Sequence, residues 1–143
     1  MTSFLEDLRN GLSIPRVDPK SLSALELAFI GDAVIETVSR TVSVSYGNKR
    51  VQELHADAIR RENAKTQSAV MNVLLPLLTE EEKRIYHRGR NAEVSTKAKN
   101  ASITEYHRAT GLEAVIGYLY LSGETARMID LLKTGWKETG VLQ

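Results

Sequence analysis

Three segments of the 143-residue chain carry the same signal for the start of a helix, and this signal most constrains the fold. In each segment a Ser or Thr is followed three residues later by a Glu, a spacing at which the two residues can cap the first helical turn reciprocally. The pairs are Ser23 with Glu26, Thr79 with Glu82, and Ser102 with Glu105. Apolar residues at helical spacing follow each pair, so the sequence predicts an all-α fold.

Glycine and proline residues mark where the predicted helices begin and end. A short amphipathic helix over 4–12 precedes two prolines, which interrupt any longer helix. We expect long helices over 25–46 and 51–75, because Gly47 follows the first and Pro76 the second. The remaining predicted helices run from 79 into the RGRN sequence at 88–91, from 102 to 121, and from 124 towards the C-terminus.

Composition limits the class of protein. The chain has no Cys, so it has no disulfide framework, and this suits a reducing cytosol. Its start lacks the pattern of a signal peptide, and no apolar run approaches the ~18 residues of a membrane span. The three His residues, at 55, 87 and 107, lack the spacing of a zinc site. We therefore expect a soluble cytoplasmic protein that does not contact a membrane.

Two acids each stand alone in an apolar, glycine-containing segment. Asp32 lies in AFIGDAVIE at 28–36, and Glu113 lies in GLEAVIGYLYL at 111–121. A glycine in a helix interior costs about 1 kcal/mol relative to Ala, so these glycines indicate that the two helices approach each other closely. Neighbouring carboxylates repel unless a proton or a cation lies between them, and hard oxygen ligands suit Mg²⁺. The alternative is that each acid pairs separately with an Arg or Lys.

A basic segment lies between these two acids in the sequence. Residues 86–100, YHRGRNAEVSTKAKN, carry four basic side chains and one acidic side chain, although the net charge of the chain is only +1. Their polar and small residues predict a loop, whereas the basic residues of 60–65 are expected on a solvated helix face. The loop is either ordinary solvated surface or an RNA contact, because its side chains can bond phosphates and 2′-hydroxyls. The candidate RNA-binding residues are Arg88, Arg90, Asn91, Lys97 and Lys99.

Two segments resemble a known family. LELAFIGDAVIE at 25–36 resembles LEFLGDAVLE, the signature of the ribonuclease III catalytic domain, and LEAVIGYLYLSG at 112–123 resembles its second motif, FEALIGAIYLDG. Two acids of the family pattern are replaced, by Ala28 and Thr110. Only 20 residues follow Gly123, too few for the separate double-stranded-RNA-binding domain. With RGRNA, these departures resemble the Mini-ribonuclease III subfamily, which consists of the catalytic domain alone.

The resemblance implies an activity and a site. Asp32 and Glu113 would be the catalytic, metal-binding acids, with Mg²⁺ as the cofactor and Mn²⁺ as a substitute. Glu36 and Glu53 are the candidates to replace the missing acids. Residues 21–143 would form the catalytic domain of the ribonuclease III helical fold, with residues 1–20 as a short helix and lead-in.

The resemblance also implies partners. The fold would form a homodimer in which Phe29 enters a socket on the other subunit, although an apolar residue at helical spacing can equally belong to the core. Each subunit would cut one strand of an RNA duplex. The substrate implied for the subfamily is the paired ends of precursor 23S ribosomal RNA, and it stays open whether a ribosomal protein assists.

Two other functions remain to be compared with this one. The first is a noncatalytic, dimeric double-stranded-RNA-binding protein, since the loss of two acids would weaken metal binding. The second is a helical, metal-dependent nucleotide hydrolase. We rank the hydrolase last, because the acids at 80–82 resemble the first turn of a capped helix.

Overall fold

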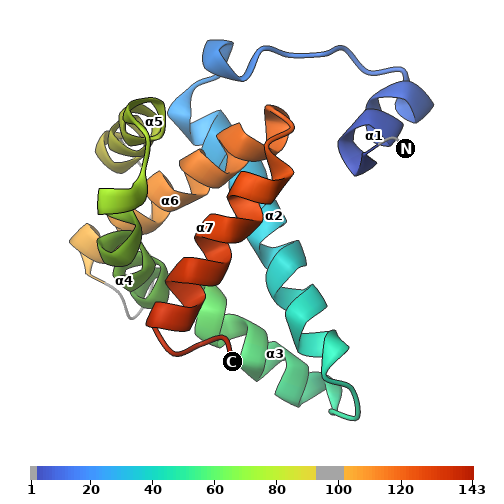
Figure 1. Ribbon diagram of the computed structural model, residues 1–143, viewed down its shortest axis with the longest axis vertical. Helices are drawn as coiled ribbons and strands as arrows, with labels where there is room; N and C mark the ends of the chain where they lie inside the picture. The colour runs from blue at the N-terminus through green and yellow to red at the C-terminus, as the bar shows by residue number, and fades with distance from the viewer. Residues whose placement is uncertain (1–2, 93–101) are drawn as a thin grey trace.

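The computed structural model describes residues 3–92 and 102–143, and this part of the chain is helical without strands (Figure 1). This confirms the predicted all-α fold. The helices are α1 (Phe4–Leu12), α2 (Ala24–Ser45), α3 (Val51–Glu62), α4 (Ala64–Leu74), α5 (Glu80–Asn91), α6 (Ile103–Leu121) and α7 (Thr125–Glu138). Single 3-10 turns lie at Pro19–Ser21 and Leu75–Leu77. Within the described residues, no helix combines the length and apolar character needed to cross a membrane.

The three predicted capping boxes are present at the starts of α2, α5 and α6. In each, the hydroxyl oxygen of the capping residue accepts a hydrogen bond from the backbone N–H of the Glu, and the Glu carboxylate accepts one from the N–H of the capping residue. The six donor–acceptor distances lie between 2.9 and 3.1 Å. Local sequence therefore sets where these three helices begin.

Two predicted boundaries are wrong. The expected helix over 51–75 is two helices, because Asn63 adopts an extended conformation (φ −69°, ψ 154°) and its side-chain oxygen accepts from the N–H of Thr66 at 2.8 Å. This cap starts α4 and ends α3. The loop expected over 86–100 does not begin at Tyr86, because α5 runs to Asn91 with Tyr86 packed in the core, as the helix predicted from 79 into RGRN requires.

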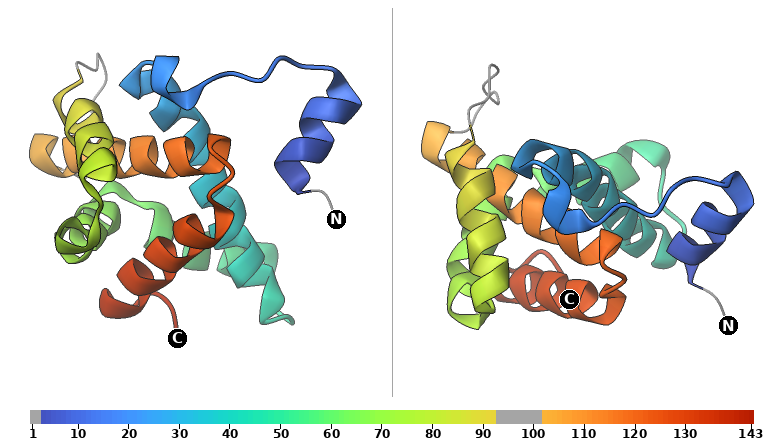
Figure 2. Two further views of the ribbon diagram at one scale, coloured as in Figure 1. Left: turned by 45° about the horizontal axis from the view of Figure 1, so that its top comes forward. Right: turned by 90° about the horizontal axis from the view of Figure 1, so that it is seen from above.

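Helices α2 and α6 cross at the centre of the molecule, while α4, α5 and α7 pack around α6 (Figures 1 and 2). Figure 2 shows α1 at one edge, joined to the rest by an extended segment. Arg9 anchors α1, because its Nη2 donates to the carbonyl of Leu121 at 3.1 Å. The core between the other helices contains Leu27, Ile35, Met71, Leu74, Leu112, Ile116, Leu131 and Trp136.

Two glycines permit the close crossing of α2 and α6. A Cβ atom on Gly31 would overlap the carbonyl group of Glu113, and one on Gly117 would overlap the carbonyl group of Leu27. Any other residue at either position would push the two helices apart, since backbone atoms cannot yield as a side chain can. The expectation that these two helices are close neighbours is confirmed.

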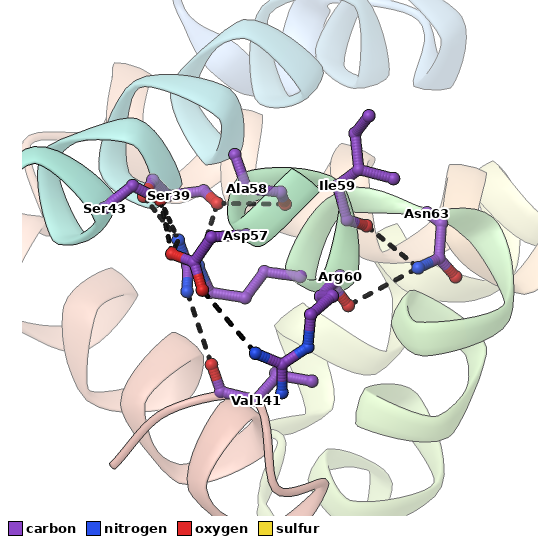
Figure 3. A network of polar contacts seen from close by, with 9 residues as sticks. Ser39, Ser43, Asp57, Ala58, Ile59, Arg60, Asn63 and Val141 are labelled. Atoms are coloured by element: carbon purple, nitrogen blue, oxygen red, sulfur yellow. Dashed lines mark hydrogen bonds and ion pairs between the residues drawn. The ribbon is translucent and has the colours of Figure 1, made fainter. Parts of the chain in front are cut away.

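The expected solvated face over 60–65 is wrong for Arg61, whose side chain is 2% exposed. Its guanidinium donates to the backbone carbonyls of Ser39 and Val141 at 2.9 and 3.4 Å and to Asp57 at 2.8 Å. Figure 3 labels the partners Ser39, Asp57 and Val141 of this polar network. It also lies over the ring of Trp136, 5.9 Å from the ring centroid. A buried charge is tolerated only when its donors are satisfied, so this cluster joins α2, α3, α7 and the C-terminal segment.

Candidate active site

A pocket of about 340 Å³ lies between α2 and α6. Both acids singled out by the sequence line it, although they are 81 positions apart in the chain. The residues that line the pocket include Ala28, Asp32 and Glu36 from α2, and Tyr106, Thr110 and Glu113 from α6. The glycine crossing brings these two helix faces together.

Asp32 and Glu113 influence each other's charge directly. Burial within the apolar α6, together with a hydrogen bond to Asp32 and the charge of Asp32, raises the pKa of Glu113 to about 9. The Glu113 carboxyl group is therefore protonated at neutral pH in the metal-free protein. Asp32 itself is exposed, contrary to the burial that its apolar neighbours in sequence suggest, because it projects from α2 into the pocket.

The alternative of separate basic partners receives no support. Within residues 3–92 and 102–143, no Arg, Lys or His forms an ion pair with Asp32 or Glu113. The two carboxyl groups instead line one pocket, and Asp32 is one cause of the raised pKa of Glu113. Such a pair can share a proton or hold a cation.

The positions of the two missing acids lie in the same pocket. The Ala28 side chain has no atom that can bind a metal ion. The Thr110 hydroxyl group donates a hydrogen bond to the carbonyl of Tyr106 in its own helix at 3.0 Å. Of the candidate replacements, Glu36 lines the pocket, whereas Glu53 is exposed on α3 outside it. Across the described residues, no three His, Cys, Asp or Glu side chains are close enough together to hold a metal ion.

The basic residues at 88–91 lie on the last turn of α5 and are exposed. Arg88 donates to the carbonyl of Leu22 at 3.0 Å, just before the start of α2. Arg90 donates to Asn91 at 3.2 Å and lies over the ring of Tyr86, 5.8 Å from the ring centroid. The other two candidates, at 97 and 99, lie outside the described residues.

Phe29 is not a core residue of this chain, because its side chain is 82% exposed. It borders both the acidic pocket and an apolar hollow of about 510 Å³. That hollow is also lined by Val17, Leu22, Leu25 and Leu121. A large exposed aromatic group beside an apolar hollow is typical of a protein–protein interface.

Two polar features were missed in the sequence. Arg40 donates to the pocket carboxylate Glu36 at 2.7 Å, and Arg61 is buried beside the same helix. Ser39 and Ser43 could have indicated the buried Arg61. They are four residues apart in an apolar helix, so both hydroxyl groups lie on one face of α2, and Arg61 donates to both.

Comparison with known proteins identifies the family. A model of the ribonuclease III domain matches residues 25–124. Mini-ribonuclease 3 of Thermoanaerobacter sp. is 44% identical over 133 residues, which cover 93% of this chain and 92% of the relative. Mini-ribonuclease 3 of Enterococcus faecalis is 42% identical over 125 residues, or 86% of this chain and 95% of the relative.

A crystal structure of similar fold is that of protein FN1578 from Fusobacterium nucleatum. It is 31% identical, with a TM-score of 0.76, and the match covers 85% of this chain and 97% of that protein. The comparisons favour neither a noncatalytic RNA-binding protein nor a nucleotide hydrolase. The chain thus belongs to the ribonuclease III family, where it resembles the Mini-ribonuclease 3 proteins over most of its length, and it is an endoribonuclease.

Proposed function

We propose that this endoribonuclease cleaves double-stranded RNA with Mg²⁺, for which Mn²⁺ can substitute, and that Asp32 and Glu113 are its catalytic, metal-binding carboxylates. The ribonuclease III domain family generally depends on divalent metal ions and acts on double-stranded RNA. The observation that carries the assignment is the meeting of these two acids, from two helices, in one pocket where the pKa of Glu113 is raised to about 9. Perturbed carboxyl groups of this kind gather at functional sites.

The donor set fits a small, hard divalent cation. Mg²⁺ takes one or two protein carboxylates and completes its shell with water and phosphate oxygens, and the pocket supplies two carboxylates and access from solvent. The bound ion would polarise the scissile phosphate and lower the pKa of a water molecule. Glu113 would hold the cation as a carboxylate and would therefore have to release its proton, and Asp32, exposed in the pocket, lies where a substrate phosphate can approach.

The end of α5 offers a surface for the duplex. Double-stranded RNA is recognised mainly by shape, through phosphates and 2′-hydroxyls. Arg88, Arg90 and Asn91 present guanidinium and amide groups to solvent there, and we assign the same role to Lys97 and Lys99. A guanidinium can bond a phosphate with two parallel N–H groups, which makes the arginines the stronger contacts.

A homodimer is the assembly that the exposed Phe29 favours. An aromatic side chain that is 82% exposed beside an apolar hollow loses this contact with water if it enters a partner subunit. Two subunits related by a two-fold axis would present two acidic pockets, one for each strand. Following the subfamily, we assign precursor 23S ribosomal RNA as the substrate and the cytoplasm as the location, with assistance by a ribosomal protein as a question for experiment.

Replacing Asp32 with Asn tests the site. We expect Asp32→Asn to retain the helical circular dichroism spectrum and duplex binding but to lose cleavage of labelled double-stranded RNA in Mg²⁺. Asp130→Asn makes the same chemical change at an exposed position on α7, outside the pocket, and should cleave normally. If Asp32→Asn cleaves at the wild-type rate, the assignment of the metal site is wrong.

A further inference from the structure

We infer that Arg40 is a counter-ion shared between Glu36 in the pocket and Glu62 behind it, so that Glu36 can become the third carboxylate of the metal site. The inference rests on the proposed function, because it takes Asp32 and Glu113 as the metal-binding pair. In the metal-free protein Arg40 pairs with Glu36. On binding of a divalent cation, Glu36 turns to the cation and Arg40 pairs with Glu62.

Glu36 occupies the position that a third ligand requires. It follows Asp32 by four residues on α2, so the two side chains project from the same helix face, and both line the pocket that contains Glu113. The small side chains at positions 28 and 110 leave the pocket with no other acid from α2 or α6. Three carboxylates would attract a divalent cation more strongly than two.

Glu36 is already paired in the metal-free protein. Arg40 Nη2 donates to Glu36 Oε1 at 2.7 Å, from one helical turn further along α2. This pairing is consistent with the finding that no metal-binding group of three acids is assembled among the described residues. Recruitment of Glu36 therefore requires that Arg40 exchange its partner.

Glu62 supplies the second partner. It is the last residue of α3, and its Oε2 is buried without a hydrogen-bond partner within the described part of the chain. Burial raises the pKa of Glu62, the Ser39 hydroxyl group lowers it, the charge of Glu36 raises it and the charge of Arg40 lowers it. A buried acceptor without a hydrogen-bond partner destabilises the fold, so a hydrogen bond from the Arg40 guanidinium would stabilise Glu62.

Arg40 is free to make the exchange. Its side chain is 58% exposed and lies on a long, flexible stem. The other nearby cation, Arg61, is 2% exposed and already donates to Ser39, Asp57 and Val141, so it cannot leave its place. Arg40 is then paired with a carboxylate in both states, with Glu36 before the cation binds and with Glu62 afterwards. Glu62 contacts neither metal nor RNA and acts as a positioning residue through Arg40.

Binding of Mn²⁺ alone, measured by electron paramagnetic resonance on RNA-free protein, tests the inference. Glu36→Gln should weaken Mn²⁺ binding about tenfold, and Glu62→Gln about threefold, because Arg40 then stays on Glu36. Arg40→Met should tighten binding. In the Arg40→Met background, Glu62→Gln should have no further effect. Glu53→Gln, an exposed change on the same helix as Glu62, should bind Mn²⁺ as the wild type does.

Two results would overturn the inference. An unchanged Mn²⁺ affinity in Glu36→Gln would exclude Glu36 as a ligand, whether or not Glu62→Gln folds. An equal effect of Glu62→Gln with and without Arg40 would show that Glu62 acts through the fold and not through Arg40. Asp32→Asn distinguishes failure of the shared counter-ion from failure of the proposed function. If it abolishes Mn²⁺ binding while Glu36→Gln does not change it, only the shared counter-ion fails; if Asp32→Asn binds Mn²⁺ normally, the proposed function fails.

Discussion

Replacing Glu113 with Gln removes a carboxyl group whose ionisation the fold opposes. The folded-state pKa is about 9, against an ordinary value of 4.5, because Glu113 is buried and faces Asp32. Between these two values the folded protein holds a proton that the unfolded chain releases, so the free energy of unfolding falls as pH rises. Below about pH 4.5 the group is neutral in both states and contributes nothing.

The magnitude follows from the width of that interval. At pH 8 the ordinary pKa lies about 3.5 units away, and each unit corresponds to ~1.4 kcal/mol, which sets a ceiling of ~5 kcal/mol. Glu113 is only partly buried by surface area, so solvent screening reduces the expected gain to ~2 kcal/mol. For a chain of this length, such a gain raises the midpoint of thermal unfolding by about 6 °C.

The measurement is urea unfolding of wild-type and Glu113→Gln proteins in EDTA, from pH 5 to pH 9, followed by the fluorescence of Trp136. The variant should be more stable at pH 8, and the difference should nearly disappear at pH 5. Glu53→Gln removes an exposed carboxylate outside the pocket and should show no such pH-dependent gain. Equal stability of Glu113→Gln and wild type at both pH values would refute the raised pKa of Glu113.

Three further substitutions test the fold and the RNA surface. Gly117→Ala should cost about 3 kcal/mol or more in urea unfolding, because its Cβ would overlap the backbone of α2, whereas Gly11→Ala, in open space on α1, should stabilise slightly. Arg61→Met should cost about 3 kcal/mol, since it leaves buried acceptors unpaired; an unchanged unfolding midpoint would mean that the cluster contributes nothing. Arg90→Ala should weaken duplex binding and reduce its salt slope by about 1, while Arg84→Ala, elsewhere on α5, keeps both; equal slopes would exclude Arg90 as a phosphate contact.

Local signals in the sequence predicted most of the helices. The capping boxes at Ser23, Thr79 and Ser102 depend on residues three apart, so they can be read without knowledge of the fold. The break at Asn63 was missed because Asn is tolerated in a helix as well as at its start. The extent of α5 into RGRN was predicted from the cap at Thr79, but the loop was expected to begin at Tyr86, because the polarity of 86–100 does not show that Tyr86 packs in the core.

Local sequence also predicted only part of the candidate site. Isolated acids and glycines in apolar helices predicted that Asp32 and Glu113 would be neighbours, because a close backbone approach demands glycine. The pairing of Glu36 with Arg40 spans one turn of α2, so its spacing is present in the sequence, although it was not singled out. The burial of Arg61 could not be predicted in this way. Its contacts join residues up to 80 positions apart, and only the folded arrangement of α2, α3 and the C-terminal segment brings these residues together.

The glycine contact between α2 and α6 makes the backbone independent of the acids that it carries. The distance between the helices depends on the absence of a side chain at Gly31 and at Gly117. The carboxylates project from the crossing and do not determine this distance. Acids can therefore be lost from this surface, as at Ala28 and Thr110, or restored to it, with no repacking of the core. Over evolutionary time the number of carboxylates could change while the framework stayed the same, whereas a change at Gly31 or Gly117 would remove the framework itself.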